Sequence, residues 1–144
     1  MRIFKYEIMA SDTDLSDAFD VRRQVFVHEQ GISEHLVFDN RDHDALHVVV
    51  NDGERIVGTA RVQFLANNQA KLERMAVTKA LRHKGIGRSI ISFLSEELKN
   101  QKVKQIVVHA QEGVIEFYKS CGFEESGTPF WEANIKHIKM HRRL

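Results

Sequence analysis

Cysteine and proline each occur only once in this sequence of 144 residues, and no long apolar run is present. Because a single cysteine, Cys121, excludes an intramolecular disulfide, the composition is typical of a protein in a reducing compartment. No apolar segment approaches the roughly 20 residues that a transmembrane helix needs. Charged residues interrupt the apolar pattern of residues 1–12, which therefore lack the features of a signal peptide. We expect a cytoplasmic protein with no membrane partner.

The charge is almost balanced, because 21 lysine and arginine residues oppose 20 aspartate and glutamate residues and leave a net charge of +1. No overall field therefore drives the chain onto nucleic acid, and no recognised nucleic-acid-binding motif is present. Binding of nucleic acid through the basic cluster in residues 79–88 is thus disfavoured. The length suits one compact domain, which we expect to span residues 1–144.

Apolar periodicity predicts alternating strands and helices with no internal repeat or linker. The expected strands cover residues 3–8, 46–50, 55–65, 71–77, 104–110, 123–125 and 137–142. The expected helices cover residues 11–30, 86–98 and 112–120. This order predicts an α/β protein (a mixed sheet of the α+β kind) with helices packed on the sheet.

Local signals predict three further details. Ser11 and Asp14 have the spacing of a weak capping box and are expected to start the first helix. Residues 32–45 are polar, rich in aspartate and histidine, and expected to form a loop. Pro129 is also expected in a loop.

Residues 71–98 carry the sharpest functional signal: a strand, a turn with two glycines and basic residues, and an amphipathic helix. In the pattern Arg82-x-x-Gly85-x-Gly87, glycines let backbone amides approach an anion, and the first amides of a helix lack intrahelical partners. Further phosphate contacts are expected from nearby side chains, namely Arg82, Lys84, Arg88 and Ser89. The Walker and GxGxxG patterns are absent. On these residues alone, an anion cradle and a glycine turn with a solvated basic face remain equally open.

Two further motifs follow in the chain. Residues 107–111 form a strand, and the next helix ends in Tyr118-x-x-x-Gly122-Phe123. With the strand before Arg82, these motifs resemble the GCN5-related N-acetyltransferase (GNAT) superfamily over nearly the full length. A narrower resemblance, to a bacterial subgroup of small uncharacterised acetyltransferases, rests on residues 21–30, 58–61 and 135–140.

The resemblance implies a GNAT-like acyl-CoA N-acyltransferase fold, with a central mixed sheet and helices on both faces. It implies an N-acetyltransferase that uses acetyl-CoA, needs no metal, and acetylates a primary amine by direct attack on the thioester. The residues that this resemblance assigns to the cosubstrate are Met75, Ala76, Val77, Arg82, His83, Lys84, Gly85, Ile86, Gly87, Arg88, Ser89 and Gln111. Whether another acyl-CoA is preferred stays open.

The resemblance also implies catalytic roles. Tyr118 matches the residue that protonates the departing CoA thiolate; the alternative is a core aromatic whose hydroxyl is bonded elsewhere. Glu73 is the first candidate for the base that takes the amine proton, and His109 is the second. An amine that arrives neutral needs neither.

The acceptor pocket is expected at the end of the first helix and the loop after it. Its candidate residues are Arg22, Phe26, Glu29, Gln30 and His137. Glu29 would pair with a cationic amine, and a solvated helix-end carboxylate is the equal alternative. The acceptor, a small-molecule amine or a peptide amine, is not fixed by the sequence.

The same residues also allow interpretations other than an N-acetyltransferase. A non-catalytic acyl-CoA-binding or sensor module would use the same cradle without chemistry. The histidines and aspartates of residues 28–47 match no metal-ligand spacing and favour a polar loop. Cys121 lacks an adjacent base and is expected to be a small core residue. Exposed strand edges favour a homodimer.

Overall fold

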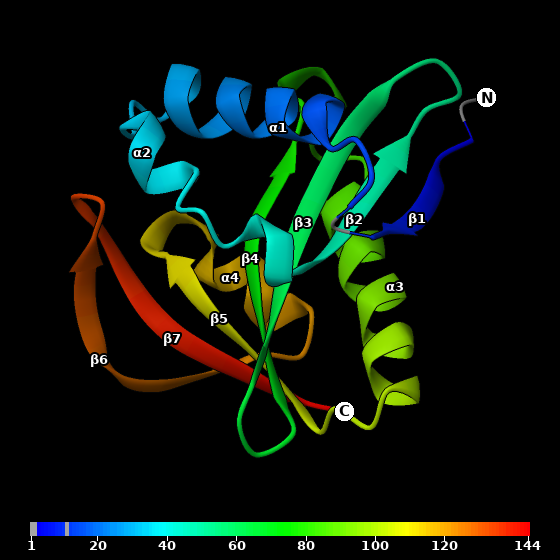
Figure 1. Ribbon diagram of the computed structural model, residues 1–144. Helices are drawn as coiled ribbons and strands as arrows, with labels where there is room; N and C mark the ends of the chain where they lie inside the picture. Colours follow the sequence, from blue (N-terminus) through cyan, green and yellow to red (C-terminus); the bar gives the residue numbers. More distant parts are fainter. Residues whose placement is uncertain (1–2, 11) are drawn as a thin grey trace.

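The computed structural model describes residues 3–10 and 12–144, and within them seven strands form one mixed sheet (Figure 1). The strand order is β1-β2-β3-β4-β5-β7-β6. β4 and β5 run parallel, and their neighbours pair antiparallel. The strands are β1 (Lys5–Met9), β2 (Leu46–Asn51), β3 (Ile56–Leu65), β4 (Gln69–Val77), β5 (Gln105–Gln111), β6 (Glu124–Glu132) and β7 (Ile135–Arg143).

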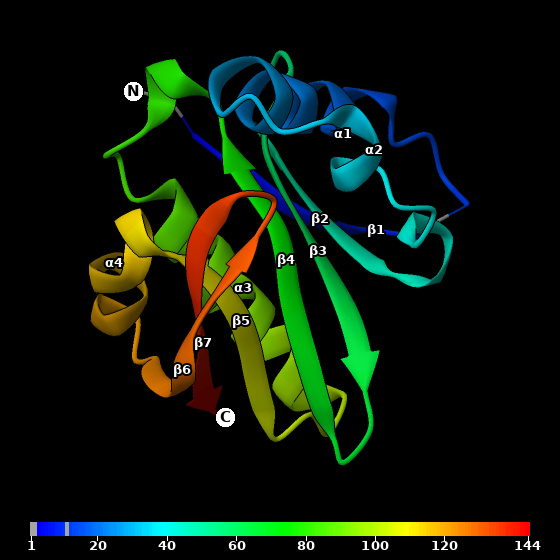
Figure 2. The ribbon, with the colours of Figure 1, turned by 90° about the vertical axis from the view of Figure 1, so that its left-hand side faces the viewer.

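Helices cover both faces of this sheet (Figure 2). The α-helices are α1 (Ser16–Arg22), α2 (Glu34–Val37), α3 (Ile86–Asn100) and α4 (Ile115–Ser120). α1 continues as a π-helix, η1 (Arg23–Glu29), and three short 3-10 turns complete the chain: η2 (Asp42–Asp44), η3 (Lys79–Leu81) and η4 (Glu112–Val114). Val21 and Val25 of α1 and η1 pack on one face, and α3 packs on the other.

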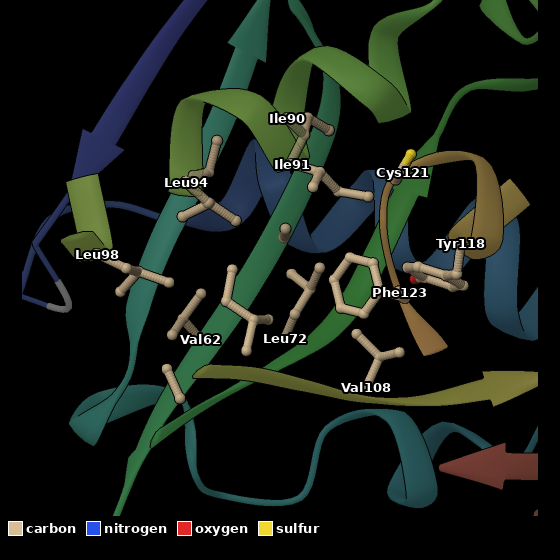
Figure 3. Close-up of a cluster of buried hydrophobic side chains, with 14 of the residues drawn as sticks. Val62, Leu72, Ile90, Ile91, Leu94, Leu98, Val108, Tyr118, Cys121 and Phe123 are labelled. Atoms are coloured by element: carbon tan, nitrogen blue, oxygen red, sulfur yellow. The ribbon is translucent and has the colours of Figure 1, made fainter. Parts of the chain in front are cut away.

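The main core lies between α3 and the sheet (Figure 3). Ile90, Ile91, Leu94 and Leu98 recur at helical spacing along α3, and each is at most 1% exposed. They contact side chains that point to this side from the central strands, including Val62, Leu72 and Val108. Burying each large aliphatic side chain contributes about 1.5–3 kcal/mol, so this packing holds α3 on the sheet.

Alternation along β5 defines the two faces. Ile106, Val108 and Ala110 belong to the α3 core, so we name that side the α3 face. Val107, His109 and Gln111 therefore point to the opposite side, the α1 face.

The parallel pair is short, and this opens the sheet. Gln69–Leu72 pair with Gln105–Val108, and no pairing is found further along these described strands. Arg74 adopts a left-handed φ of 54°, and the β3–β4 register shifts between Thr59 and Arg61. Because a bulge bends and twists the strand that carries it, β4 turns away from β5 beyond Leu72.

The expected element order and the mixed sheet with helices on both faces are confirmed, with local differences. Ser11 lies outside the described residues. α1 begins at Ser16, not at residue 11, and the Asp14 carboxylate accepts hydrogen bonds from the Ser16 amide at 2.9 Å and its hydroxyl at 2.7 Å. The carboxylate therefore closes a turn before the helix rather than forming a capping box.

Two segments expected as loops contain regular structure. Residues 32–45 include α2 and η2. Pro129 lies within β6, at a register shift between Ser126 and Phe130. β6 is the edge strand, so the missing amide hydrogen of the proline costs no ladder hydrogen bond. Among the described residues, no helix is both long and apolar enough to span a membrane.

Candidate active site

A cavity of about 1010 Å³ lies where β4 and β5 separate. It reaches both faces of the sheet, because Phe117 and Tyr118 of α4 line it together with His109 and His137 of the α1 face. Its other walls come from η1, the α2 region, the β4 bulge and the β6–β7 turn. Residues far apart in the sequence thus share one space.

On the α3 face, the turn before α3 presents unpaired amides. His83 and Gly85 have φ values of 62° and 83°, which turn the chain sharply into α3. Within the described part of the chain, the amides of residues 83–88 have no hydrogen-bond acceptor, and no side chain caps the helix. The side chains of His83 and Lys84 are exposed beside them. Such amides at a helix start fit an anionic group, and phosphate is the usual one.

Two arginines of this turn are already engaged. Arg82 forms two hydrogen bonds to the Glu29 carboxylate, at 2.8 and 2.7 Å, and donates a third to the Val77 carbonyl oxygen at 3.0 Å. Arg88 donates to the carbonyl oxygen of Ser120 at 3.0 Å and to its hydroxyl at 2.8 Å. Both guanidinium groups therefore brace neighbouring elements rather than point to an open phosphate site.

The two glycines of the motif have different roles. Gly85 supplies the left-handed residue that starts α3. Gly87 has no such φ, but a Cβ there would lie 3.2 Å from Cζ of Phe117. The second glycine thus lets α3 approach α4, which carries Tyr118.

Tyr118 lines the cavity and also belongs to the α3 core, where it lies beside Phe123 (Figure 3). Its ring packs edge-on against Phe117 and Phe123, with centroids 5.2 and 5.3 Å away. Burial raises the pKa of Tyr118, so the phenol keeps its proton at neutral pH. Its hydroxyl makes no hydrogen bond to any described residue, which argues against a core tyrosine that is bonded elsewhere.

Glu73 lies on the wall of the α1 face, where three cations surround its carboxylate. Nη2 of Arg61 is 3.2 Å away, Nζ of Lys71 is 3.4 Å away, and Nη1 of Arg74 is 3.9 Å away. Arg61 is fully buried and also binds the Asp39 carboxylate through two hydrogen bonds, at 2.7 and 3.1 Å. This network fixes the segment after α2 against the sheet.

Three side chains from three strands converge at the other wall of this face. Nδ1 of His109 is 3.4 Å from Oε1 of Glu132, and Nε2 of His137 is 3.8 Å from Oε2 of the same carboxylate. Phe130 stacks on His137 and packs edge-on against His109. The His109 hydrogen bond lowers the pKa of Glu132, which is therefore ionised at neutral pH.

The acceptor residues expected from the sequence divide into two groups. Phe26, Gln30 and His137 line the cavity. Arg22 does not: it is fully buried, and Nη1 donates to the Asp42 carboxylate at 2.8 Å. Glu29 pairs with Arg82, outside the cavity wall, and this pairing lowers its pKa.

The remaining expected residues lie at the cavity or beside it. Met75, Ala76 and Val77 form its β4 wall, and Arg82 and His83 line it as well. Gln111 lines the opposite wall, and its side-chain amide donates to Oε1 of Gln30 at 2.9 Å across the opening. Ser89 is exposed on α3, and Ile86 is buried in the core.

Sequence reasoning missed several wall residues, chiefly Glu132, Asp39 and Arg74. Glu132 ends β6, a strand expected to begin at residues 123–125 with Pro129 in a loop after it, so its position opposite His109 had no sequence signal. The pattern of alternating polar residues on the last two strands was the only available hint. Among the described residues, no group of three or more His, Cys, Asp or Glu side chains is arranged to hold a metal ion.

A mixed sheet that opens between two parallel strands beside an amide-lined helix start defines the class of acyl-CoA N-acyltransferase folds. The chain belongs to the GNAT acetyltransferase family, because residues 12–144 match the model of the acetyltransferase (GNAT) domain. It is therefore an N-acetyltransferase of this family, and the family resemblance seen in the sequence is confirmed.

Known proteins of similar sequence and structure agree. The uncharacterised N-acetyltransferase YjcF of Bacillus subtilis is 34% identical, over 94% of this chain and 97% of that protein. A putative N-acetyltransferase from Lactobacillus plantarum superposes with a TM-score of 0.92 at 26% identity, covering 98% of both chains. A GNAT acetyltransferase from Elizabethkingia anophelis, solved with acetyl-CoA bound, has a TM-score of 0.78 at 16% identity over 98% of both chains, a likeness of fold alone.

Proposed function

We propose that this protein transfers the acetyl group of acetyl-CoA to a primary amine, on a small molecule or a peptide, by direct attack of the amine on the thioester. The observation that carries the proposal is the unpartnered Tyr118 hydroxyl at the cavity where β4 and β5 separate. A protonated donor with no partner of its own is suited to protonate a leaving group.

The chain offers a place for each part of the cosubstrate. The amides of residues 83–88 are available to the pyrophosphate, because nothing in the described chain occupies them. The gap beside Met75–Val77 offers unpaired strand backbone to the pantetheine arm, since β5 no longer pairs there. Acetyl-CoA supplies an activated acetyl group. The chain positions the two substrates and protonates the departing thiolate.

Carboxylates on the α1 face support a cationic acceptor. Asp39, Glu73 and Glu132 all line the cavity there. Glu132 is the carboxylate best placed to meet an ammonium group, because no lysine or arginine forms an ion pair with it among the described residues, whereas Asp39 and Glu73 are already paired with such cations. The phosphates would lie at the α3 face. The two substrates therefore enter from opposite sides, which is the geometry that direct attack requires.

In the step itself, the amine nitrogen forms a bond to the carbonyl carbon and the carbon–sulfur bond breaks. Tyr118 donates its proton to the departing sulfur. The proton that the new amide nitrogen loses restores the phenol. Because burial holds the proton on Tyr118 at neutral pH, the thiolate receives it only as it develops.

A thiol-release assay with acetyl-CoA and a panel of primary amines tests the proposal. Tyr118→Phe is expected to lower kcat by about 10²-fold or more, because general acid catalysis typically contributes 10²–10⁴-fold. Acetyl-CoA affinity, measured by calorimetry, should be unchanged. Tyr6→Phe is the matched control: Tyr6 packs on Phe93, with ring centroids 6.1 Å apart, and does not line the cavity.

The calorimetric measurement also distinguishes the alternative function, a non-catalytic acyl-CoA-binding module. A wild-type protein that binds acetyl-CoA and releases no thiol with any amine would be an acyl-CoA-binding module. Undiminished thiol release by Tyr118→Phe would remove Tyr118 from the mechanism.

A further inference from the structure

Glu132, His109 and His137 form a polar cluster on the α1-face wall of the cavity. We propose that His109, held by the Glu132 carboxylate, is the group that takes the proton from the acceptor ammonium. This inference rests on the proposed acetyl transfer and assigns it a base.

The position of His109 suits this role. It is the first β5 residue after the last pair with β4, Leu72 with Val108. It therefore stands at the point where the strands part, on the α1 face, across the sheet from Tyr118. An acid on one face and a base on the other would serve a leaving sulfur and an arriving nitrogen that lie on opposite sides of the carbonyl.

The hydrogen bonds fix which ring nitrogen is free. A carboxylate can only accept, so Nδ1 of His109 carries the hydrogen that faces Oε1 of Glu132 at 3.4 Å. In the neutral ring, Nε2 then holds the lone pair, and it has no partner among the described residues. A carboxylate behind a histidine also stabilises the imidazolium that forms when Nε2 takes a proton.

The surrounding side chains hold the ring in place. Phe130 packs edge-on against His109 with centroids 5.0 Å apart, and it stacks on His137 at 5.8 Å. Nδ1 of His137 donates to the Ile135 carbonyl oxygen at 2.7 Å, which orients the ring with Nε2 3.8 Å from Oε2 of Glu132, a contact that is an ion pair only when His137 is protonated. Glu132 is thus shared between two oriented rings.

Glu73, which stands on the neighbouring strand, is less suited to the role. Its carboxylate already accepts a charge-assisted hydrogen bond from Arg61, with Lys71 and Arg74 close by. Protonation would weaken all three interactions. Glu73 is therefore already paired with cations and is poorly placed to deprotonate the acceptor.

Other charges face the cluster and belong in any reading of its pH dependence. Lys71 and Glu73 of β4 stand on one side. Lys139 of β7 pairs with His109 in register and is exposed. His137 and Glu132 are the titratable groups within the cluster itself.

The protons balance. The ammonium gives one proton to Nε2 of His109, which passes it to solvent. The neutral amine then attacks the thioester, Tyr118 protonates the sulfur, and the second proton that the nitrogen loses as the amide forms restores the Tyr118 phenol. The sum is ammonium plus thioester giving amide, thiol and one free proton.

Kinetics with two amines of different basicity test the role. Propylamine is protonated at neutral pH, whereas 2,2,2-trifluoroethylamine is largely neutral and needs no base before attack. His109→Gln is expected to lower kcat/KM for propylamine at neutral pH by about 10²-fold or more. The loss for trifluoroethylamine should be much smaller. An equal loss for both amines, or no loss, would overturn the assignment.

His141→Gln is the matched control. His141 lies on β7 and, like His109 on β5, faces a glutamate, with Nε2 4.0 Å from Oε2 of Glu124, but it does not line the cavity. It should leave both rates unchanged. Glu132→Gln should reduce the propylamine rate selectively, because the carboxylate that orients His109 is gone.

Nuclear magnetic resonance gives a readout that needs no turnover. Long-range ¹H–¹⁵N spectra of the histidine rings should show the Nδ1–H tautomer for His109, identified by its loss in His109→Gln, and a changed tautomer balance in Glu132→Gln. An Nε2–H tautomer in the wild-type protein would contradict the proposal. Thiol release with neither amine would count against the proposed function instead, and the spectrum would still decide the state of His109.

Discussion

The α3 face and the α1 face contribute to one cavity in different ways. On the α3 face, the site is backbone: amides of residues 83–88 and an open strand edge at Met75–Val77. On the α1 face, it is side chains, with Arg61, Asp39 and Glu73 in one ionic network and His109 with Glu132 in another cluster. A backbone site suits one invariant ligand, whereas side chains can be exchanged to select an acceptor.

The difference extends to how each side is stabilised. The α3 face is stabilised by apolar packing beneath α3. We expect this packing to tolerate small changes in the turn before α3. The α1 face depends on Arg61, whose guanidinium is fully buried and bonded to carboxylates. Removal of this guanidinium empties a fully buried position and leaves Asp39, Asp42 and Glu73 with only their remaining cations, so we expect the α1 face to be the more vulnerable half.

The largest expected effect is therefore at Arg61. Arg61→Ala should lower the free energy of unfolding by about 3–5 kcal/mol, because it breaks a buried ion-pair network. Urea unfolding measures this, with Arg55→Ala in the exposed β2–β3 turn as the control. A loss below about 1 kcal/mol, the range of surface pairs, would show that the network does not hold the acceptor wall.

Asp39 tests the same network through pH. Burial, the largest single cause, would raise the pKa of Asp39, but the hydrogen bonds and charge of Arg61, the Arg41 amide and the charge of Arg74 together lower it to about 2 from 3.8. The carboxylate therefore stabilises the fold above its unfolded pKa, and this contribution disappears as the pH falls from about 4 to 2. Asp39→Asn should cost about 2 kcal/mol at pH 7, and its stability should converge with that of the wild-type protein near pH 2. Parallel stability curves down to pH 2 would contradict this account.

Gly85 probes the other face with a smaller effect. Gly85→Ala places a side chain at φ 83°, which costs about 1–2 kcal/mol although no atom lies within 4 Å of the new Cβ. The strain would also disturb the amides, so acetyl-CoA affinity should fall. Gly53→Ala, at a glycine with equal space and a left-handed φ of 103° outside the cavity, is the control for the strain itself. Equal affinity in the two variants would argue against the amide cradle.

The smallest effect is expected at the pair that joins the two halves. Glu29 and Arg82 are about one-third exposed, so Glu29→Gln should change stability by less than about 1 kcal/mol. Because the change releases Arg82, acetyl-CoA affinity should stay the same or rise. A clear fall in affinity, measured by calorimetry, would mean that the ion pair itself shapes the cosubstrate site.

The same contrast explains what could be predicted from the sequence. Residues 82–89 and Tyr118 lie in contiguous motifs, so their spacing indicated both the turn and the helix. The side-chain directions of Arg82 and Arg88 were not predictable, because their partners Glu29 and Ser120 are 53 and 32 positions away. The local spacing of residues therefore predicts the backbone conformation, whereas the directions of these side chains depend on partners that are distant in the sequence.

The acceptor wall shows the limit more clearly. Arg22 lies in a helix expected to face the acceptor, but it turns inward to Asp42 of η2, a segment expected to be a loop. Glu132 reaches His109 only because β6 continues past Pro129. Neither fact has a local signal, since each depends on how distant strands and turns come together.

The most direct test of the central claim is a crystal structure of the protein with CoA. We expect the pyrophosphate on the amides of residues 83–88, the pantetheine arm beside Met75–Val77, and the thiol within hydrogen-bond distance of the Tyr118 hydroxyl. CoA bound elsewhere, or a thiol remote from Tyr118, would contradict the account.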